Sequence, residues 1–392
     1  MRPALISVVV AATLAVPPAE ATWSIVAADS ETQEVVVASA TCVTGIDLKR
    51  YTPVVVVGRG GGAAQSYVDT TGVRRAIIWD GLIDGLTAQA IIDELIAVPN
   101  SSLHQHGVAE STSATSATQT GANNGAYASG VTGAFGSVHY AIQGNVLTGE
   151  PVIAAAEAAF VGTAGDLPAR TMAAMEAARS MGGDGRCSCS PSAPTSCGSP
   201  PPSFAKAADI GYLIISRFGD TDDSACTSTG CADGDYFMDF NIANQSTSDP
   251  DPVLQLQVLF DAARAALIGR PDAIASEVDF APIGTDTWLL HIQLKDWQAS
   301  SIGTGVATLD VVHAPSSAQV TAIGTVVDLG NGAFQVTLTE SGSQGVDVFQ
   351  ITADDGIRPV VLPPRRASLD LDPIFTDGFE SGTTAAWSGS AP

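Results

Sequence analysis

Short apolar runs separated by polar turns dominate the first half of the chain. Residues 22–29 and 34–41 are the first two runs, and the polar residues 30–33 lie between them. Alternation rich in β-branched residues is typical of strands, and a short polar turn between two strands predicts a hairpin. Similar patterns predict further strands at residues 54–57, 60–68, 138–146, 210–217 and 236–242.

Helical periodicity predicts five helices, at residues 75–82, 87–97, 151–161, 167–181 and 251–268. Pro151 is typical of a helix start, and Gly182 with Gly183 is typical of a helix end. Residues 100–124 are polar, and we expect a loop-rich stretch with one strand inside. Strands, two groups of helices and returning strands predict a layered domain over residues 22–270, in which helices cover mixed sheets.

The composition changes after residue 270 to regularly spaced β runs separated by glycine and asparagine turns. These runs occupy residues 288–297, 305–312, 319–329, 333–339 and 346–353. The spacing predicts a small all-β sandwich of immunoglobulin type over residues 271–363. We expect residues 364–392 to be a linker and a C-terminal tail, in which residues 375–388 resemble a sorting element.

The first 21 residues have the pattern of an export signal. Arg2 provides a positive start, residues 4–16 are apolar, and residues 19–21 are a small-x-small cleavage site. The apolar run is too short for a stable membrane anchor, and no later segment reaches transmembrane length. We therefore expect a secreted or periplasmic protein that is not an integral membrane protein. The alternative is an uncleaved N-terminal strand.

Charge and cysteine content narrow the choice of partners and compartment. The formal net charge of −24 disfavours nucleic acid and anionic membranes, which would repel this surface. The six cysteines fit an oxidising compartment and allow 15 complete pairings, of which a Cys226–Cys231 bridge is the preferred local one. Zinc is the alternative, but no Cys-x-x-Cys pair or histidine stands at ligand spacing, and we expect no metal or cofactor.

Cleavage after Ala21 would expose the α-amine of Thr22. A threonine hydroxyl is a weak nucleophile at neutral pH, and the α-amine of the same residue, with a pKa near 8, is a suitable base. Because every exported protein exposes some residue in this way, the position alone is weak support for catalysis.

A series of motifs resembles the domain-of-unknown-function family 1028. TWSIVAAD and EVVVASATCV begin the series, GAAQSYVD, IIWDGL, YAIQGNVLTGEPVI and ARTMAAMEAARSMGGDGR follow, and DFNIANQSTSDPDPVLQL ends it near residue 267. The resemblance implies a four-layer αββα fold of the N-terminal-nucleophile-hydrolase type, within the α+β class, with Thr22 as the nucleophile. The family has no agreed substrate. Residues 187–206 are inserted where members of the family continue directly into the next strand. A substrate preference of other members therefore does not carry over to this chain.

Other candidate site residues are Ser39, Gln65 and Asn145. Ser39 lies on the second strand and could reach Thr22, whereas a packed small residue is the alternative. Gln65 and Asn145 match positions where polar amides end strands in the family, and either could donate to an oxyanion. Turn capping is an equal alternative for Asn145.

Three further groups of polar residues have plainer explanations. Arg74 and Arg75 suggest a carboxylate contact, with a surface ion pair favoured. Asp184 is expected to close a helix-end turn. The sequence at 104–106 contains two histidines, and we expect an ordinary polar loop there.

These observations lead to two hypotheses. The first is an exported hydrolase that uses Thr22 on an amide or related bond of a small-molecule or peptide-like substrate. The second is a non-catalytic extracellular protein that binds cell wall or glycan and reuses the fold. Homo-oligomerisation is left open.

Cleavage at the expected site is directly testable. Intact-mass measurement and N-terminal sequencing of the secreted protein, without reductant, should give a chain that starts at Thr22 with a free amine. A chain that starts elsewhere, or a blocked Thr22, would remove the base and leave the binding hypothesis.

Overall fold

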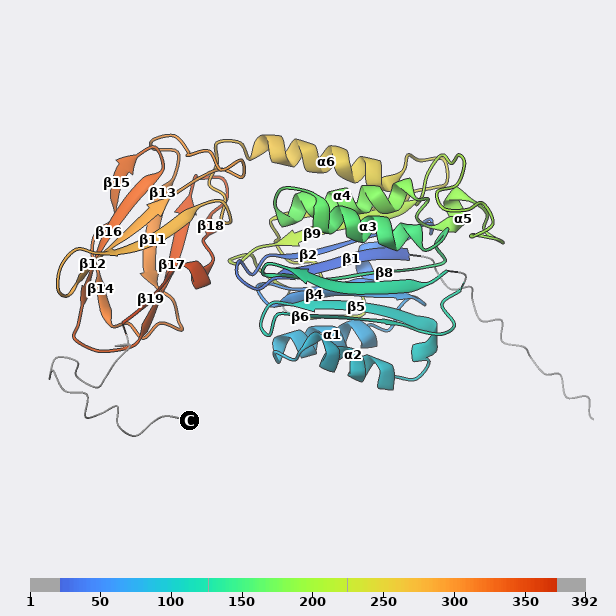
Figure 1. Cartoon of the computed structure of the whole chain (residues 1–392), viewed down its shortest axis with the longest axis horizontal. Coiled ribbons are helices and arrows are strands. Elements are labelled where there is room, and N and C mark those ends of the chain that lie inside the picture. The colour runs from blue at the N-terminus through green and yellow to red at the C-terminus, as the bar shows by residue number, and fades with distance from the viewer. Residues whose placement is uncertain (1–21, 126, 224, 372–392) are drawn as a thin grey trace, which may run out of the picture.

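The structure is a computed structural model that describes residues 22–125, 127–223 and 225–371. The expected signal peptide and the tail from residue 372 onward lie outside the described residues. Figure 1 shows two parts. A layered part of sheets and helices ends with helix α6 (Pro252–Ala266), and an all-β part follows it. The chain is thus of the α+β class, as the sequence predicted.

One sheet of the layered part has six strands in the order β10-β9-β2-β1-β8-β7, and all neighbours are antiparallel. Its strands are β1 (Thr22–Asp29), β2 (Val35–Thr41), β7 (Ser129–Phe135), β8 (Val138–Asn145), β9 (Ile210–Ser216) and β10 (Met238–Ile242). The predicted hairpin of β1 and β2 is confirmed. Because β2 and β8 flank it on both sides, β1 lies at the centre of the sheet.

The second sheet has four strands in the order β3-β4-β5-β6. They are β3 (Pro53–Val56), β4 (Gly60–Ser66), β5 (His104–Glu110) and β6 (Thr115–Thr120). The prediction of a loop-rich stretch with one strand over residues 100–124 is only partly right, because two strands, β5 and β6, lie there. Their small and polar residues carry no apolar alternation, so it is the pairing of β5 with β4 and of β6 with β5 that makes them strands.

Helices cover the outer face of each sheet, so Figure 1 shows helices, sheet, sheet and helices in four layers. Residues of α1 (Val73–Ile83) and α2 (Ala88–Ala97) pack on the four-stranded sheet. Residues of α3 (Pro151–Gly162), α4 (Leu167–Ser180) and α6 pack on the six-stranded sheet. A third apolar cluster lies between the two sheets.

Glycines allow the layers to approach closely at two places. A Cβ at Gly61 in β4 would lie 2.7 Å from Val37 Cγ2 of the facing sheet. After α4, Gly183 has a φ of 52°, and a Cβ there would lie 2.7 Å from the Trp23 ring. At both positions a Cβ would come closer than van der Waals contact allows, so replacing the glycine would displace its surroundings.

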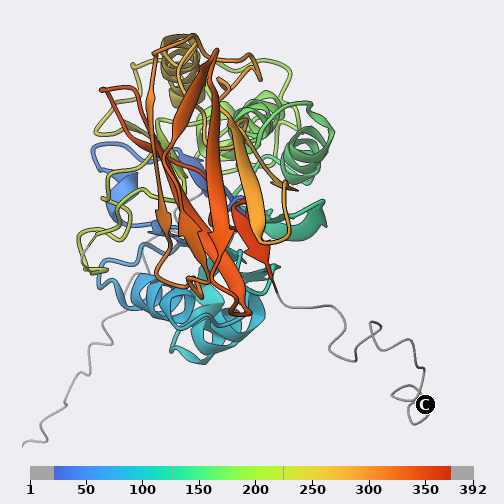
Figure 2. The same cartoon turned by 90° about the vertical axis from the view of Figure 1, so that its left-hand side faces the viewer.

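The all-β part consists of two sheets around a separate apolar core that includes Leu290, Phe334 and Phe349. Figure 2 shows these sheets toward the viewer. One sheet contains β11 (Glu277–Pro282), β12 (Thr287–Gln293), β14 (Thr321–Ile323), β15 (Val327–Gly330) and β16 (Ala333–Glu340). The other contains β13 (Thr308–His313), β17 (Val346–Asp354), β18 (Val360–Val361) and β19 (Ser368–Asp370).

The expected linker begins later than predicted. The 3-10 helix η3 (Pro364–Arg366) and strand β19 continue the fold, and β19 pairs with β17. Leu369, which is buried, belongs to the core of this part. One buried leucine among polar residues is too weak a pattern to predict a strand from sequence.

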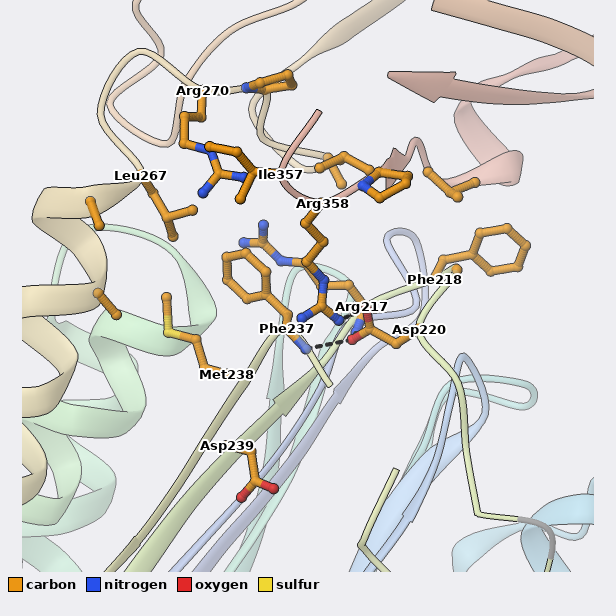
Figure 3. Close-up of a pocket in the computed structure, with 18 of the residues that line it drawn as sticks. Arg217, Phe218, Asp220, Phe237, Met238, Asp239, Leu267, Arg270, Ile357 and Arg358 are labelled. Atoms are coloured by element: carbon orange, nitrogen blue, oxygen red, sulfur yellow. Dashed lines mark hydrogen bonds and ion pairs between the residues drawn. The ribbon is translucent and has the colours of Figure 1, made fainter. Parts of the chain in front are cut away.

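Ion pairs join the two parts, and those of Arg217 are buried. Arg217 at the end of β9 bonds through Nε to Glu34 at 2.7 Å and through Nη1 to Asp272 at 2.7 Å. Arg358 bonds to Asp220 at 2.9 Å across the same junction. Figure 3 shows Arg217 and Arg358 at a cavity of about 340 Å³ with largely apolar walls. Removal of one partner from a buried ion pair leaves an unpaired buried charge, which is strongly destabilising.

The Glu34 carboxyl should make stability depend on pH. Its burial raises its pKa to about 7 from the usual 4.5, against the opposing effect of Arg217. The folded state therefore holds a proton in a pH range where the unfolded state has lost it, and the free energy of unfolding should fall as pH rises from about 4.5 to about 7.

Glu34→Gln should flatten this pH dependence, and the exposed Glu94→Gln should not. Urea unfolding at pH 5 and at pH 8 would measure the difference for each protein. An unchanged pH slope in Glu34→Gln would show that another group is responsible.

Candidate functional site

The alternation of β1 divides its side chains between two environments. Trp23 and Ile25 belong to the core beneath α3 and α4, whereas Val26 belongs to the cluster between the sheets. Because strand side chains alternate, Thr22 and Ser24 lie on the same face as Val26. The inter-sheet space is thus apolar along most of β1 and becomes polar toward Thr22.

Thr22 is buried at the start of β1, with 2% of its surface exposed. Its cross-strand partners are Thr41, the last residue of β2, and Asn145, the last residue of β8. Its carbonyl oxygen accepts a hydrogen bond of 3.0 Å from Gln65 Nε2 in the facing sheet. The end of the central strand is therefore held from both sides and from the opposite layer.

Gln65 is the centre of a hydrogen-bonded network between the sheets. Its Oε1 accepts from Ser24 Oγ, and its Nε2 donates to Gln105 Oε1 at 2.8 Å as well as to Thr22. Ser24 Oγ lies 2.9 Å from Ser39 Oγ, and Ser39 Oγ donates to the Trp23 carbonyl at 2.8 Å. Buried polar groups are stable when they are satisfied in this way.

Asn145 belongs to a second polar group beside Thr22. Its Nδ2 donates to Ser66 Oγ at 3.2 Å and to the Asn124 carbonyl at 3.5 Å, and Ser66 Oγ donates to Asn124 Oδ1 at 3.2 Å. Ser66 has a φ of 78°, which is uncommon for a residue other than glycine. The strained end of β4 thus turns Ser66 toward the residue that pairs with Thr22.

On the other side of Thr22 lies a buried ion pair. Arg186 Nη2 bonds to Asp184 at 2.9 Å and to Thr41 Oγ1 at 3.4 Å. Asp184 also accepts from the backbone of Cys42 at 2.6 Å, and its burial raises its pKa despite the nearby Arg186. The expectation that Asp184 closes a helix end is wrong, because it caps the start of the short helix α5 (Gly185–Ser188).

Disulfides tie the interrupting segment 187–206 to this end of the molecule. All six cysteines are paired, as Cys42–Cys187, Cys189–Cys197 and the predicted Cys226–Cys231. Cys42 directly follows Thr41, so the first bridge holds Arg186 near the partner of Thr22. The Sγ atoms of this bridge also lie within 4.8 Å of Asp209, but sulfurs joined to each other are not thiolate ligands for a metal.

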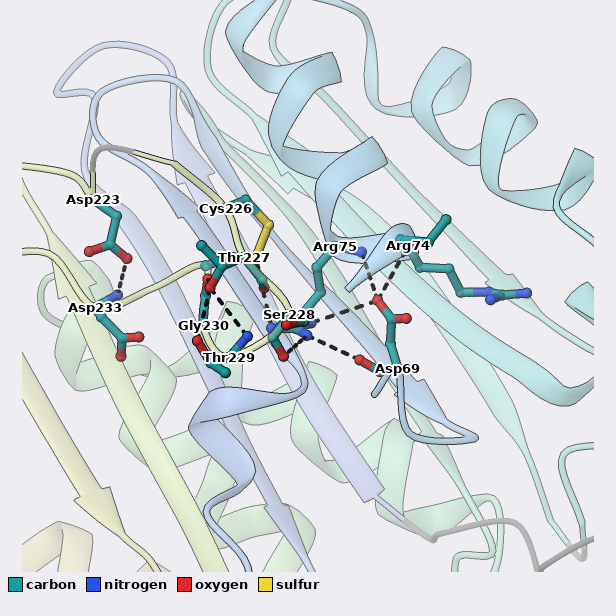
Figure 4. Close-up of a disulfide and its surroundings, with 12 residues drawn as sticks. Asp69, Arg74, Arg75, Asp223, Cys226, Thr227, Ser228, Thr229, Gly230 and Asp233 are labelled. Carbon is teal, nitrogen blue, oxygen red and sulfur yellow. Dashed lines mark hydrogen bonds and ion pairs between the residues drawn. A yellow bond between two sulfur atoms is a disulfide. The ribbon is translucent and has the colours of Figure 1, made fainter. Parts of the chain in front are cut away.

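Arg75 and its neighbours lie on the other side of the four-stranded sheet. Arg75 is fully buried and bonds to the carbonyl oxygens of Arg50, Asp69 and Ser228, beside the Cys226–Cys231 bridge (Figure 4). The favoured ion pair is present, between Arg75 Nε and Asp69 at 3.7 Å, but it is buried, so only its expected place at the surface is wrong. Arg75 anchors the start of α1 and does not reach Thr22.

His104 and His106 lie on strand β5 and not in a loop. Both are buried, and burial lowers the pKa of each ring to about 4, so they are neutral at neutral pH. They alternate with Gln105, which faces the inter-sheet network. Side chains alternate between the two faces of a strand, so a strand at residues 104–106 would place Gln105 on the face opposite the two histidines. This alternation is the signal that would have assigned Gln105 to that network.

The structure brings all four predicted site residues to one place. Gln65 bonds directly to Thr22, Asn145 pairs with it, and Ser39 is linked to it through Ser24. The interactions also involve residues that sequence reasoning did not select, namely Ser24, Thr41, Ser66, Gln105, Asn124 and Arg186. Among the described residues, no helix is long and apolar enough to cross a membrane.

Residues 22–194 match the family described as "Family of unknown function (DUF1028)", which confirms the family resemblance over this range. Among solved structures, the chain is similar to a protein of this family from Silicibacter pomeroyi, with 18% identity over 62% of this chain and 89% of that chain and a TM-score of 0.43. Two bacterial proteins of about 9% identity align over 87% of this chain. They are invasin, an integrin-binding protein (38% of that chain, TM-score 0.17), and the Escherichia coli adhesin FdeC (96% of that chain, TM-score 0.18). No curated protein matches the chain.

Two glutamines of the inter-sheet layer should respond oppositely to the same substitution. Gln65 uses both ends of its amide, whereas the amide atoms of buried Gln143 have no hydrogen-bond partner among the described residues. Gln65→Met should lower the free energy of unfolding by about 2 kcal/mol, since it strands its partners. Gln143→Met should be neutral or stabilising, because it removes an unsatisfied amide.

Chemical denaturation of the two variants beside the wild type measures this difference. Equal destabilisation by both substitutions would contradict the assignment of Gln65 as the centre of the network.

Proposed function

We propose that the protein is a hydrolase in which Thr22, released by cleavage after Ala21, attacks an amide or related acyl bond. The observation that carries the proposal is the position of Thr22. It is the first residue of the central strand, it lies between two sheets, and hydrogen bonds hold its carbonyl oxygen. The four layers around it are those expected of the N-terminal-nucleophile-hydrolase type, and the family match begins at this residue.

The α-amine and the hydroxyl of Thr22 would share the chemistry. The amine takes the proton of Oγ as Oγ forms a bond to the substrate carbonyl carbon, and the carbonyl oxygen becomes an oxyanion. The ammonium then returns the proton to the leaving amine as the carbon–nitrogen bond breaks, which leaves an acyl ester on Thr22. Water attacks the ester with help from the same amine and releases the carboxylic acid and the free hydroxyl.

The neighbours of Thr22 suit different tasks in this scheme. Gln65 Nε2 donates to Thr22 O and to Gln105, so both of its N–H groups are in use and Gln65 is a positioning residue. Ser39 is likewise engaged with Trp23 and Ser24. Asn145 Nδ2 also has two acceptors, but its contact with the Asn124 carbonyl is long, at 3.5 Å, so Asn145 can more easily turn an N–H toward an oxyanion.

Arg186 would contribute electrostatically. Its guanidinium reaches Thr41 Oγ1, next to Thr22, and a cation near the α-amine favours the neutral amine that can act as a base. The Cys42–Cys187 bridge and the Asp184 carboxylate keep Arg186 in this position.

Covalent labelling tests the proposal without a known substrate. An activated acyl ester should add its acyl mass to the peptide that begins with Thr22 in the mature protein. Thr22→Ala should abolish labelling, Thr22→Ser should retain it, and retention of a residue before Thr22 should slow it on the order of 10³-fold, because the base is blocked while the hydroxyl remains. Equal labelling of the mature and the extended protein would refute the role of the amine.

A further inference from the structure

A cleft of about 510 Å³ opens at the end of the two sheets, close to Asn145. Its walls include Thr118, Thr120, Asn124, Ala128, Ser129 and Gly130. None of the residues that line it is charged or aromatic, and none has a large apolar side chain. Most ligand pockets have mainly apolar walls, so this cleft favours a small uncharged group that forms hydrogen bonds.

The cleft lies between two sheet edges. Strand β6 is the last strand of the four-stranded sheet, and β7 is the last strand of the six-stranded sheet. Along their outer sides, the described residues contain no further strand that pairs with either of them. An edge strand presents backbone N–H and C=O groups to an extended chain, and short side chains leave these groups accessible.

Hydrogen bonds connect the cleft to Thr22. Gln105 accepts a hydrogen bond from Gln65 Nε2. It donates in turn to Thr120 Oγ1 at 2.8 Å and to the Ser129 carbonyl at 3.0 Å. Asn124 lines the cleft and accepts from Asn145, the cross-strand partner of Thr22. A chain bound along the cleft would thus lie beside the nucleophile.

Gln143 lies behind the lining of the cleft, and its amide faces Gly107 of β5. A Cβ at Gly130 would lie 2.7 Å from Thr118 Oγ1 and 3.1 Å from Gln143 Cβ, so these three residues meet there. The amide atoms of Gln143 have no hydrogen-bond partner among the described residues.

We propose that this cleft binds an extended peptide as an added strand on β6 or β7, with a small uncharged side chain inside the cleft. The inference rests on the proposed function, because Thr22 would cleave an amide of the bound peptide. Three features favour a peptide over a glycan, namely two edge strands, a lining of hydroxyls and amides, and the lack of an aromatic ring on which a sugar could stack. The strongly acidic chain disfavours acidic peptides in addition.

Binding can be measured separately from cleavage by using the mature Thr22→Ala protein. The probes are blocked hexapeptides of serine, glycine and asparagine, the same peptides with a central lysine, glutamate or phenylalanine, and a version with alternate N-methylated amides. Titration followed by amide chemical shifts should show binding of the neutral peptides and at least about tenfold weaker binding of the others, because charge, bulk or a lost backbone donor each removes a contact.

Substitutions on β7 and just before it give a matched pair. Ala128→Lys places a charge in the cleft and should weaken binding of the neutral peptide about tenfold. Ala134→Lys, at an exposed position of β7 away from the cleft, should leave binding unchanged. A native thermal transition in both variants shows that they fold.

The outcomes separate this inference from the proposed function. No peptide binding, equal binding of charged and neutral peptides, or binding of acetamido-sugar oligomers in their place would overturn the peptide site even if Thr22 is acylated by an activated ester. Selective peptide binding to Thr22→Ala, without any acylation of the mature wild type, would support the site and refute the hydrolase.

Discussion

The glutamine-centred network between the two sheets is the interaction on which the candidate site depends. Gln65 bridges the layers because it accepts a hydrogen bond from Ser24 and donates hydrogen bonds to both Thr22 and Gln105. An apolar contact could hold the sheets together equally well, but it would not fix the carbonyl oxygen of Thr22. Hydrogen bonds have direction, so a satisfied polar layer can set the orientation of the first residue of a strand.

Two further constraints keep that end of the molecule in place. The Cys42–Cys187 bridge joins the end of β2 to the segment that carries Asp184 and Arg186, which are far from β2 in sequence. At the opposite end, Arg217 joins the layered part to the all-β part through Glu34 and Asp272. A disulfide thus cross-links the surroundings of the polar site. The junction between the two parts depends instead on ion pairs, and the protonation of Glu34 changes with pH.

Valine-rich strands and amphipathic helices could be predicted closely, as β1, β2 and the five long helices show, because their patterns come from the face that each buries. Strands β5, β6 and β7 could not, since they are rich in small or polar residues, which leave no apolar alternation. The same limit applies to the site. Motif positions in the sequence could select Thr22, Gln65 and Asn145. In contrast, strand pairing brings Gln105 to the site, and a disulfide brings Arg186 there.

The sequence by itself determined the α+β class, the central hairpin, the family resemblance and the presence of a threonine at the start of the first strand. These properties depend on local pattern and composition, which a single chain displays directly. Only the tertiary structure decided that Gln65 faces Thr22, that two histidines are buried and neutral, and that an uncharged cleft lies between two sheet edges. Such properties arise from residues far apart in sequence, whose distances and burial are set when the layers pack.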